Sequence, residues 1–295
     1  MHIESYLKYL KFEKRYSSHT IRAYTDDLHQ FESFIQSLPI DSNLQVLTGV
    51  DHTLVRKWII FLYNNNISPR SINRKISSLK KFYNFLIQNQ IIESNPFDKV
   101  IIPKVSKKLP EFIKQEEITN LFDYIDFPED FKGYRDKLIL ELLYGSGMRL
   151  SELINLKEQD INLIDLTMRV LGKRNKERII PFPHYLTNKI TEYIKAKKSE
   201  NLNSDFLFIT LKGEKTYPKL IYRVVTGYLS LVTTNEHKSP HSLRHTYATH
   251  LLNNGADLNA IKELLGHANL SATQIYTHNT FKKLNNIYKL AHPRA

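Results

Sequence analysis

The sequence predicts a mainly α-helical protein of two domains, with one small β-sheet in the second domain. Apolar residues recur at steps of three and four through most of the chain, which is the period of amphipathic helices. One stretch near residues 167–182 is instead rich in Val, Ile, Leu and Phe around a polar turn, as in a β-hairpin. A length of 295 residues allows two cores, because single domains commonly hold ~100–200 residues.

The first domain, residues 1–92, is predicted to be a four-helix unit. The run 17–38 opens with Ser17 and Ser18, both candidate N-caps, and places apolar side chains on one face. The run 68–90 opens with a serine and a proline, which suit the N-cap and the first turn. Shorter helices are expected near 2–14 and 51–64. The polar face of the run 68–90 carries four cations: Arg70, Arg74, Lys80 and Lys81.

Residues 93–110 predict an exposed basic linker, because periodicity fails there and prolines recur among Lys104, Lys107 and Lys108. The second domain then spans residues 111–279. Its hairpin is expected from strands 167–172 and 178–182, with a charged tip between them. Its helices are expected near 114–126, 131–145, 150–158, 184–197, 219–232, 241–254, 258–265 and 271–278. A last helix near 280–290 has an apolar stripe that needs a surface to cover it.

Composition favours a polyanionic partner. The chain has 42 Lys and Arg against 30 Asp and Glu, and the excess is shared between residues 1–110 (16 against 9) and the remainder (26 against 21). Such charge suits nucleic acid, although a solvated positive surface gives the same balance. The absence of cysteine excludes disulfides and thiolate metal sites. With no signal-peptide core and no long apolar run, we expect a soluble, cytoplasmic protein.

Six side chains of the second half form a set suited to phosphoryl transfer to a tyrosine. A phosphodiester under attack accumulates negative charge, which paired guanidinium forks bind well. Two of the six stand three residues apart and so share one helix face. A helix-end histidine beside a salt-bridged arginine, and an Arg149–Glu152 pair, are the structural alternatives. The six are Arg149, Lys173, His241, Arg244, His267 and Tyr276.

The proton donor and the nucleophile are harder to choose from sequence. Lys173 lies at the predicted hairpin tip and could protonate a departing oxygen, but Arg174 and Lys176 compete for that role. Among 17 tyrosines, Tyr276 stands nine residues after His267. A phenol is also a good leaving group, which suits a reversible exchange.

A metal enzyme is the main competing chemistry for a chain with 12 histidines. His241 and His245 have the i, i+4 spacing of a helical ligand pair, but no His-Glu-x-x-His motif or carboxylate cluster accompanies them. We therefore expect no metal and no other cofactor.

The motifs around the six residues resemble those of the tyrosine site-specific recombinases, and within them the Xer-type chromosome dimer resolvases. They are Gly145-Ser-Gly-Met-Arg-Leu-Ser-Glu-Leu153, Pro240-His-Ser-Leu-Arg-His245 and Leu264-Leu-Gly-His-Ala-Asn-Leu-Ser-Ala-Thr-Gln-Ile-Tyr-Thr-His278. The resemblance extends to the first domain and to the final residues His292-Pro-Arg-Ala295. It implies a helical core-binding (SAM-like) domain and a catalytic domain that form a C-shaped clamp on DNA.

The resemblance also implies roles for individual residues. Tyr276 would form a 3′-phosphotyrosyl bond, with His241 as proton acceptor, Lys173 as general acid and His267 in a supporting role. Glu152 would orient the site. Strand exchange would pass through a Holliday junction without ATP or metal. The expected DNA contacts are Arg70, Arg74, Lys80, Lys81, Lys104, Lys107, Lys108, Arg174, Lys176 and Arg178.

By the same resemblance, four protomers would assemble on two double-stranded recombination sites. They would be identical, or paired with a paralogous recombinase, and a DNA translocase is a candidate partner. The tail, residues 280–295, would dock on a neighbouring protomer, the alternative being its own domain. A DNA-binding module without catalysis and a nicking-closing topoisomerase are the competing functions. Sequence leaves open the DNA site and the choice between dimer resolution, element integration and inversion.

Overall fold

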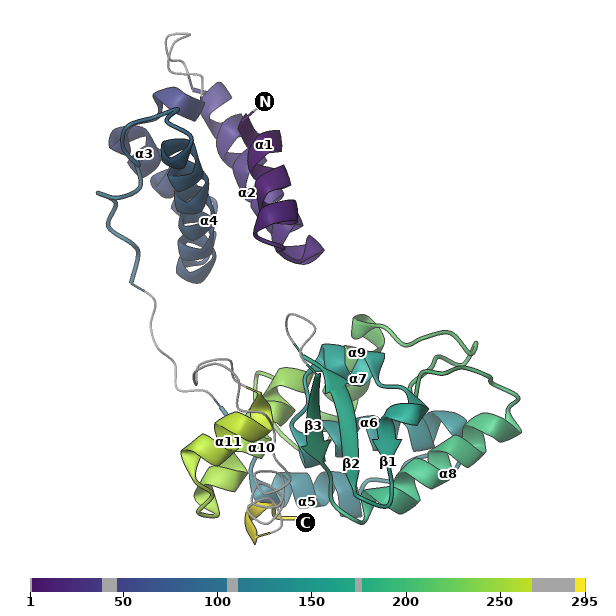
Figure 1. Cartoon of the computed structure of the whole chain (residues 1–295). Helices are drawn as coiled ribbons and strands as arrows, with labels where there is room; N and C mark the ends of the chain where they lie inside the picture. Colours follow the sequence, from purple (N-terminus) through teal and green to yellow (C-terminus); the bar gives the residue numbers. More distant parts are fainter. Residues whose placement is uncertain (1, 39–46, 105–110, 173–176, 267–289, 295) are drawn as a thin grey trace. The chain divides into compact units, whose positions relative to one another are not determined.

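The computed structural model describes residues 2–38, 47–104, 111–172, 177–266 and 290–294. The chain divides into two compact units, residues 1–108 and 109–295 (Figure 1). The division falls within the stretch 93–110 that lost its periodicity. Each unit has its own hydrophobic core.

The described part of the N-terminal unit is helical. Its helices begin where the sequence offers caps: the side chains of Ser17, Asp51 and Ser68 each accept a hydrogen bond from a backbone N–H of the first turn. Such caps satisfy donors that have no partner within the helix. The first helix continues as a π-helical turn, Tyr9–Glu13, rather than as one α-helix to residue 14. The α-helices are α1 (His2–Lys8), α2 (Ser18–Gln36), α3 (His52–Asn64) and α4 (Pro69–Gln88).

Aromatic side chains fill the core of this unit. The rings of Phe31 and Trp58 meet edge to face with centroids 4.8 Å apart, and Phe97 packs against both. Asn95 holds the chain there, since its Oδ1 accepts from the Phe97 N–H and its Nδ2 donates to the Lys80 carbonyl. The start of the stretch that we predicted as an exposed linker is therefore packed on the core, since Asn95 and Phe97 are buried.

The C-terminal unit, which we predicted to be the catalytic domain, is built around one buried helix. Helix α6 is buried along nearly its whole length, and helices α8 and α10 pack against it. The helices in the described residues of this unit are α5 (Gln115–Asp123), α6 (Phe131–Ser146), α7 (Leu150–Asn155), α8 (Leu186–Ser199), α9 (Pro218–Leu229), α10 (Pro240–Asn253) and α11 (Leu258–Leu265). The predicted helix 150–158 ends early, at Asn155, and a 3₁₀ turn follows at Glu158–Asp160.

A three-stranded antiparallel sheet lies in this unit, in the order β1 (Ile161–Asn162), β2 (Thr167–Leu171) and β3 (Glu177–Pro181) (Figure 1). Strands β2 and β3 form the predicted hairpin, with Thr167 opposite Pro181 and Leu171 opposite Glu177. Strand β1 was not predicted. Alternation turns Met168 and Val170 inward on β2 and Arg178 and Ile180 inward on β3.

The last described residues, 290–294, pack on their own C-terminal unit. The His292 ring is buried against the rings of Tyr144 and Tyr247, at centroid distances of 5.1 and 5.6 Å. Arg294 forms a two-bond ion pair with Asp123, at 2.9 and 3.1 Å. The predicted helix 271–278, and 280–290 except for its last residue, lie outside the described residues.

None of the helices within the described ranges has the length and apolarity needed to cross a membrane.

Burial of His292 predicts an acid-sensitive anchor. Burial lowers the pKa of His292 to about 3, from an ordinary value of 6.5. The unfolded chain then binds more protons than the folded chain between these values, so this contribution to stability is complete above about pH 6.5 and is lost as the pH falls. The slope is about 1.4 kcal/mol per pH unit inside the window. We expect His292→Phe to remove this slope in urea unfolding measured from pH 7 to 4. Parallel pH profiles of the two proteins would contradict the assignment.

Candidate active site

Arg149 is placed by the sharp turn between α6 and α7. Helix α6 ends at Gly147, which has a left-handed φ of 59°. A Cβ there would lie 2.4 Å from Cδ1 of Tyr247, so both the conformation and the packing require glycine. Arg149 then caps α7, and its backbone N–H donates to Glu152 Oε2 at 2.7 Å.

The Glu152 carboxylate lies at the centre of the site and is only 1% exposed. Arg149 donates from Nη1 to its Oε1 at 2.9 Å, and Arg178 donates from Nη2 to its Oε2 at 2.8 Å. Burial by itself would raise the pKa of Glu152, but the hydrogen bonds and charges of Arg178 and Arg149 outweigh that effect and lower it. The carboxylate therefore stays ionised and joins α7 to β3.

Arg244 enters the same site from helix α10. Ser239 caps this helix and Pro240 occupies its first turn, which puts Arg244 one turn further in, 7% exposed. Its guanidinium donates to the carbonyls of Gly147 and Leu265. Burial, together with the nearby charges of Arg149 and Arg178, lowers the pKa of Arg244 to about 10. The residue remains a cation at neutral pH.

The C-terminal end of α11 closes the cluster. Its last carbonyls accept from all three arginines: Leu264 from Arg178, Leu265 from Arg244, and Gly266 from Arg149. A helix C-terminus carries partial negative charge and unpaired carbonyls, so it is a favourable place for cations. Gly266 is left-handed, with φ of 63°, and precedes His267 in the sequence. The sequence analysis did not predict this set of backbone acceptors. The only sequence feature that could have indicated it is Gly266, a residue type that ends helices.

The histidines of α10 have different surroundings. His241 is exposed in the first turn, three residues before Arg244. His245 is half-buried. His250 is buried, and its Nδ1 lies 3.0 Å from the Tyr144 hydroxyl. No three His, Asp or Glu side chains in the described parts of the chain are grouped so that they could hold a metal ion.

The structure thus brings together Arg149, Glu152 and Arg244 as a cluster, with His241 on the same helix as Arg244. Arg178, expected as a DNA contact, is instead buried and bound to Glu152. Seven predicted site residues lie outside the described residues: Lys107, Lys108, Lys173, Arg174, Lys176, His267 and Tyr276.

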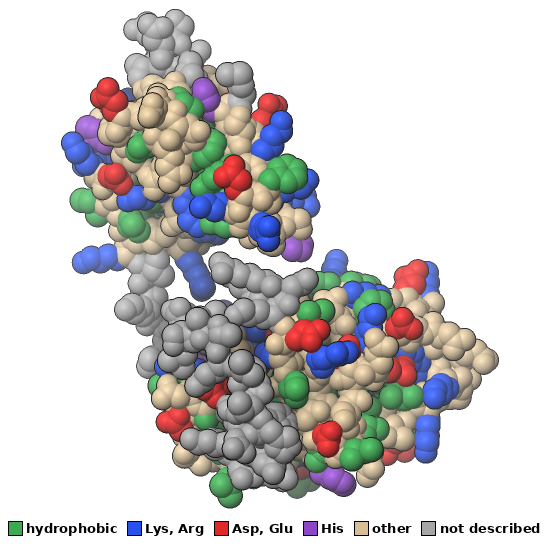
Figure 2. Space-filling model, in the orientation of Figure 1, with side chains coloured by type: hydrophobic (Ala, Val, Ile, Leu, Met, Phe, Trp, Pro, Cys, Tyr) green, Lys and Arg blue, Asp and Glu red, His purple; other side chains and the backbone are tan. Residues whose placement is uncertain are grey.

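Of the cations predicted on the N-terminal unit, Arg70 and Lys104 are exposed. Arg74 pairs with Asp27, and Lys80 pairs with Asp98 at 2.7 Å. Lys81 lies within 5.5 Å of the ring centroids of two tyrosines. The visible face of the C-terminal unit mixes basic and acidic side chains and shows no uniform positive patch (Figure 2).

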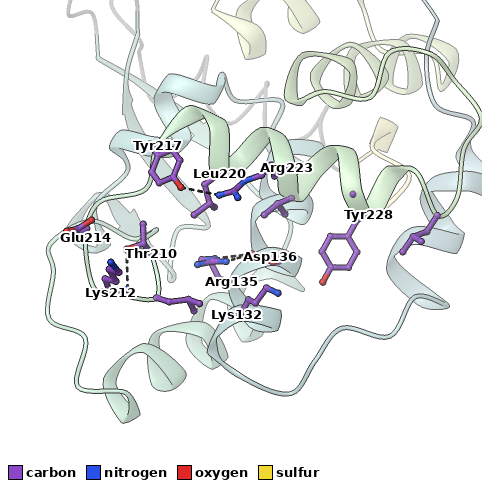
Figure 3. A pocket seen from close by; sticks show the side chains of 14 residues that line it. Lys132, Arg135, Asp136, Thr210, Lys212, Glu214, Tyr217, Leu220, Arg223 and Tyr228 are labelled. Carbon is purple, nitrogen blue, oxygen red and sulfur yellow. Dashed lines mark hydrogen bonds and ion pairs between the residues drawn. The ribbon is translucent and has the colours of Figure 1, made fainter.

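A separate surface pocket of about 770 Å³ lies between the start of α6, the turn 210–214 and α9. Its floor holds the buried Arg135–Asp136 ion pair, and Arg223 donates to the Tyr217 hydroxyl at its wall (Figure 3). None of the arginine-cluster residues lines it. We assign it no part in the candidate chemistry.

Comparison with known proteins gives a consistent result. Residues 111–283 match the family model described as the phage integrase family, and residues 3–90 match the phage integrase N-terminal SAM-like domain. The chain is similar to tyrosine recombinase XerC of Chlorobaculum tepidum, with 39% identity over 98% of this chain and 94% of the relative. The XerC of Bacillus subtilis is 39% identical over 99% and 96% of the two chains.

Solved structures share the fold at lower identity. The XerH recombinase bound to its difH substrate, before cleavage, has a TM-score of 0.70 at 22% identity and covers 97% of this chain and 83% of that chain. The Tn1549 transposon integrase in complex with a circular intermediate DNA has a TM-score of 0.70 at 18% identity, over 97% and 99%. These similarities show that the fold is shared.

Replacing Glu152 tests the architecture of the cluster. We expect Glu152→Gln to destabilise the C-terminal unit by about 3 kcal/mol, because it leaves the buried Arg178 cation without a counter-charge. The measurement is urea unfolding at neutral pH. Asp160→Asn is the control, since Asp160 pairs with the exposed Arg169 and such surface pairs contribute ~0–1 kcal/mol. Equal effects of the two changes would show that Glu152 has no central structural role.

Proposed function

Because this chain belongs to the phage integrase family and is a tyrosine recombinase, an enzyme that breaks and rejoins DNA in site-specific recombination, we propose that its arginine cluster binds the phosphate under attack. The observation that carries the proposal is the convergence of Arg149 and Arg244 at the end of α11, directly before His267 in the sequence. Two guanidiniums at one place provide the charge-assisted donors that a phosphorane needs. Glu152 holds Arg149, and the carbonyls of Gly147 and Leu265 hold Arg244.

The reaction that we propose is a transesterification at this phosphate. The Tyr276 hydroxyl oxygen attacks phosphorus while His241 accepts the phenol proton. The bond from phosphorus to the 5′-oxygen breaks, and Lys173 protonates the leaving oxygen. The products are a 3′-phosphotyrosyl bond and a free 5′-hydroxyl, so the phosphodiester energy is conserved. Attack of that hydroxyl on the partner strand reverses the chemistry, and it requires neither ATP nor metal.

The same premise supports a proposal for the partners. We propose that the ligand is a double-stranded recombination site and that four protomers assemble on two such sites. The support for a recombination site as the ligand is that XerH, which shares this fold, was solved bound to its difH substrate. The similarity to XerC relatives favours resolution of chromosome or plasmid dimers, with a second recombinase and a DNA translocase as candidate partners. Such a substrate would place the enzyme at the nucleoid.

The tail adds a constraint on assembly. We propose that residues 280–289 dock on a neighbouring protomer, as the apolar stripe suggested. Residues 291–294 nevertheless contact their own unit through Ala291, His292 and Arg294. If the tail docks on a neighbouring protomer, residues 291–294 must either leave their own unit or stay bound to it while only residues 280–289 reach the neighbour.

Tyr276→Phe tests the nucleophile. Loss of the hydroxyl should abolish the covalent protein–DNA species on nicked suicide substrates and leave DNA binding unchanged, because phenylalanine keeps the ring but cannot attack phosphorus. Tyr222→Phe, at an exposed tyrosine of the same unit, is the matched control and should form the adduct normally. An adduct that persists in Tyr276→Phe would exclude this assignment.

Removal of either arginine should slow cleavage far more than it weakens binding. We expect Arg149→Ala and Arg244→Ala to lower the single-turnover rate at saturating DNA by about 10²–10³-fold, by analogy with loss of one oxyanion-hole donor. Arg169→Ala removes an exposed arginine of the same unit and should cleave at the wild-type rate.

The cleavage rate of the wild-type protein should be unchanged in EDTA, because the proposed reaction uses no metal ion. Activity that is lost in EDTA and restored by a divalent ion would refute the metal-free reaction.

A further inference from the structure

The most strongly coordinated acidic side chain of the N-terminal unit is Asp27, on α2. Its side chain is 1% exposed and receives four hydrogen bonds from α4. Arg74 donates to both carboxylate oxygens at 2.5 and 2.8 Å, Lys75 donates at 2.9 Å, and Ser78 donates at 2.9 Å. This cluster ties α2 to α4 with two cations on one buried anion.

Stability alone does not account for such an arrangement. A buried ion pair loses the hydration of both partners, and apolar residues of similar size often stabilise a helix contact as well or better. The residues around Asp27 on the same two helices, such as Leu28 and Leu79, show that apolar packing is available at this contact. The buried carboxylate has a second effect besides stability: it orients the cations that are bound to it.

Asp27 engages only part of the Arg74 guanidinium. Asp27 engages one N–H of Nη1 and one of Nη2, which form the end of the guanidinium fork. The side edge, made by Nε and the outer N–H of one Nη, has no other protein partner in the described part of the chain. The Arg74 side chain is 49% exposed, so this edge can reach a ligand outside the protein. A guanidinium edge with two parallel N–H donors matches a phosphate.

A second cation of α4, Lys81, is also held by acceptors from the neighbouring segment. Arg70 lies one turn before Arg74, and Lys81 lies two turns after it on the same side of α4. Two tyrosines, Tyr16 just before α2 and Tyr24 within it, hold Lys81, whose Nζ lies 3.4 and 3.0 Å from their hydroxyls. Acceptors in and just before α2 thus hold two of the cations of α4, Arg74 and Lys81.

We propose that Asp27 is a positioning residue for DNA binding, which holds Arg74 so that the free edge of its guanidinium meets a backbone phosphate. The inference rests on the proposed function, since it takes DNA as the ligand. Asp27 itself touches no DNA. Its effect passes through Arg74, so it must disappear when Arg74 is absent.

The sign of the Asp27→Asn effect separates this role from simple electrostatics. Removing a negative charge from a DNA-binding protein should by charge alone tighten binding. A positioning role predicts the opposite, about a tenfold loss of affinity, the size expected when one charge-assisted hydrogen bond is lost. Asp98→Asn is the matched control: it makes the same chemical change at an exposed pair with Lys80 and should bind at least as tightly as the wild type.

The experiment is fluorescence anisotropy of the full chain with a mixed-sequence DNA duplex over a series of salt concentrations. Arg74→Ala should lower the affinity and reduce the log–log salt slope by about 1. Asp27→Asn should weaken binding alone and have no further effect in the Arg74→Ala background. Arg74→Lys keeps the charge but loses the fork, so it should also weaken binding, and it tests the proposal even if Asp27→Asn fails to fold. Thermal unfolding of each variant reports folding separately.

Asp27→Asn binding as tightly as the wild type, or additive losses in the double variant, would overturn the proposal, as would wild-type affinity in Arg74→Lys. The proposed function is assessed in parallel by the Tyr276-dependent adduct of the wild-type protein. An adduct with no Asp27 effect would remove only the positioning role, whereas no adduct would remove the proposed function itself.

Discussion

The ion pairs of Glu152 hold together the segments that carry the arginine cluster. This carboxylate comes from α7, and its two arginine partners come from the α6–α7 turn and from β3. Through Arg178 and Arg149 it also reaches the end of α11, whose carbonyls these arginines bind. Without the buried negative charge, three guanidiniums would face one another in a poorly hydrated site. The position of each element near the cluster therefore follows from the need to neutralise that charge.

The carbonyls of α11 are the second part of this balance. In the structure they accept hydrogen bonds from Arg149, Arg178 and Arg244 at the place where we propose that a phosphate binds. Each guanidinium has five N–H donors, so an arginine can hold a carbonyl and a phosphate oxygen together. Because the chain passes from Gly266 directly to His267, binding of a phosphate by these arginines would be linked to the start of the segment that leads to Tyr276. We therefore propose that these backbone acceptors couple phosphate binding to the placement of Tyr276.

Sequence predicted the features that rest on local periodicity and capping. The helices α2, α3, α4 and α11 begin within one residue of their expected positions, where Ser17, Asp51, Ser68 and Asp257 cap them, and they end within two residues of their expected positions. Strand β1 was missed because two residues have no detectable alternation. The grouping of Arg149, Glu152 and Arg244 could be anticipated from their motifs. The burial of Arg178 could not, since it depends on which face of β3 meets Glu152, and neither could Phe97, whose place in the core is set by long-range packing.

Both units use the same arrangement on a different scaffold. In each, one fully buried carboxylate holds two cations: Glu152 holds Arg149 and Arg178, and Asp27 holds Arg74 and Lys75. One anion with two cations leaves a net positive charge, so each cluster can still attract a phosphate. The anion also fixes the direction of the remaining donors, which long cationic side chains would otherwise lose to rotational freedom. Acidic residues in this basic protein therefore do more than reduce its net charge, because at these two positions they determine where the positive charge points.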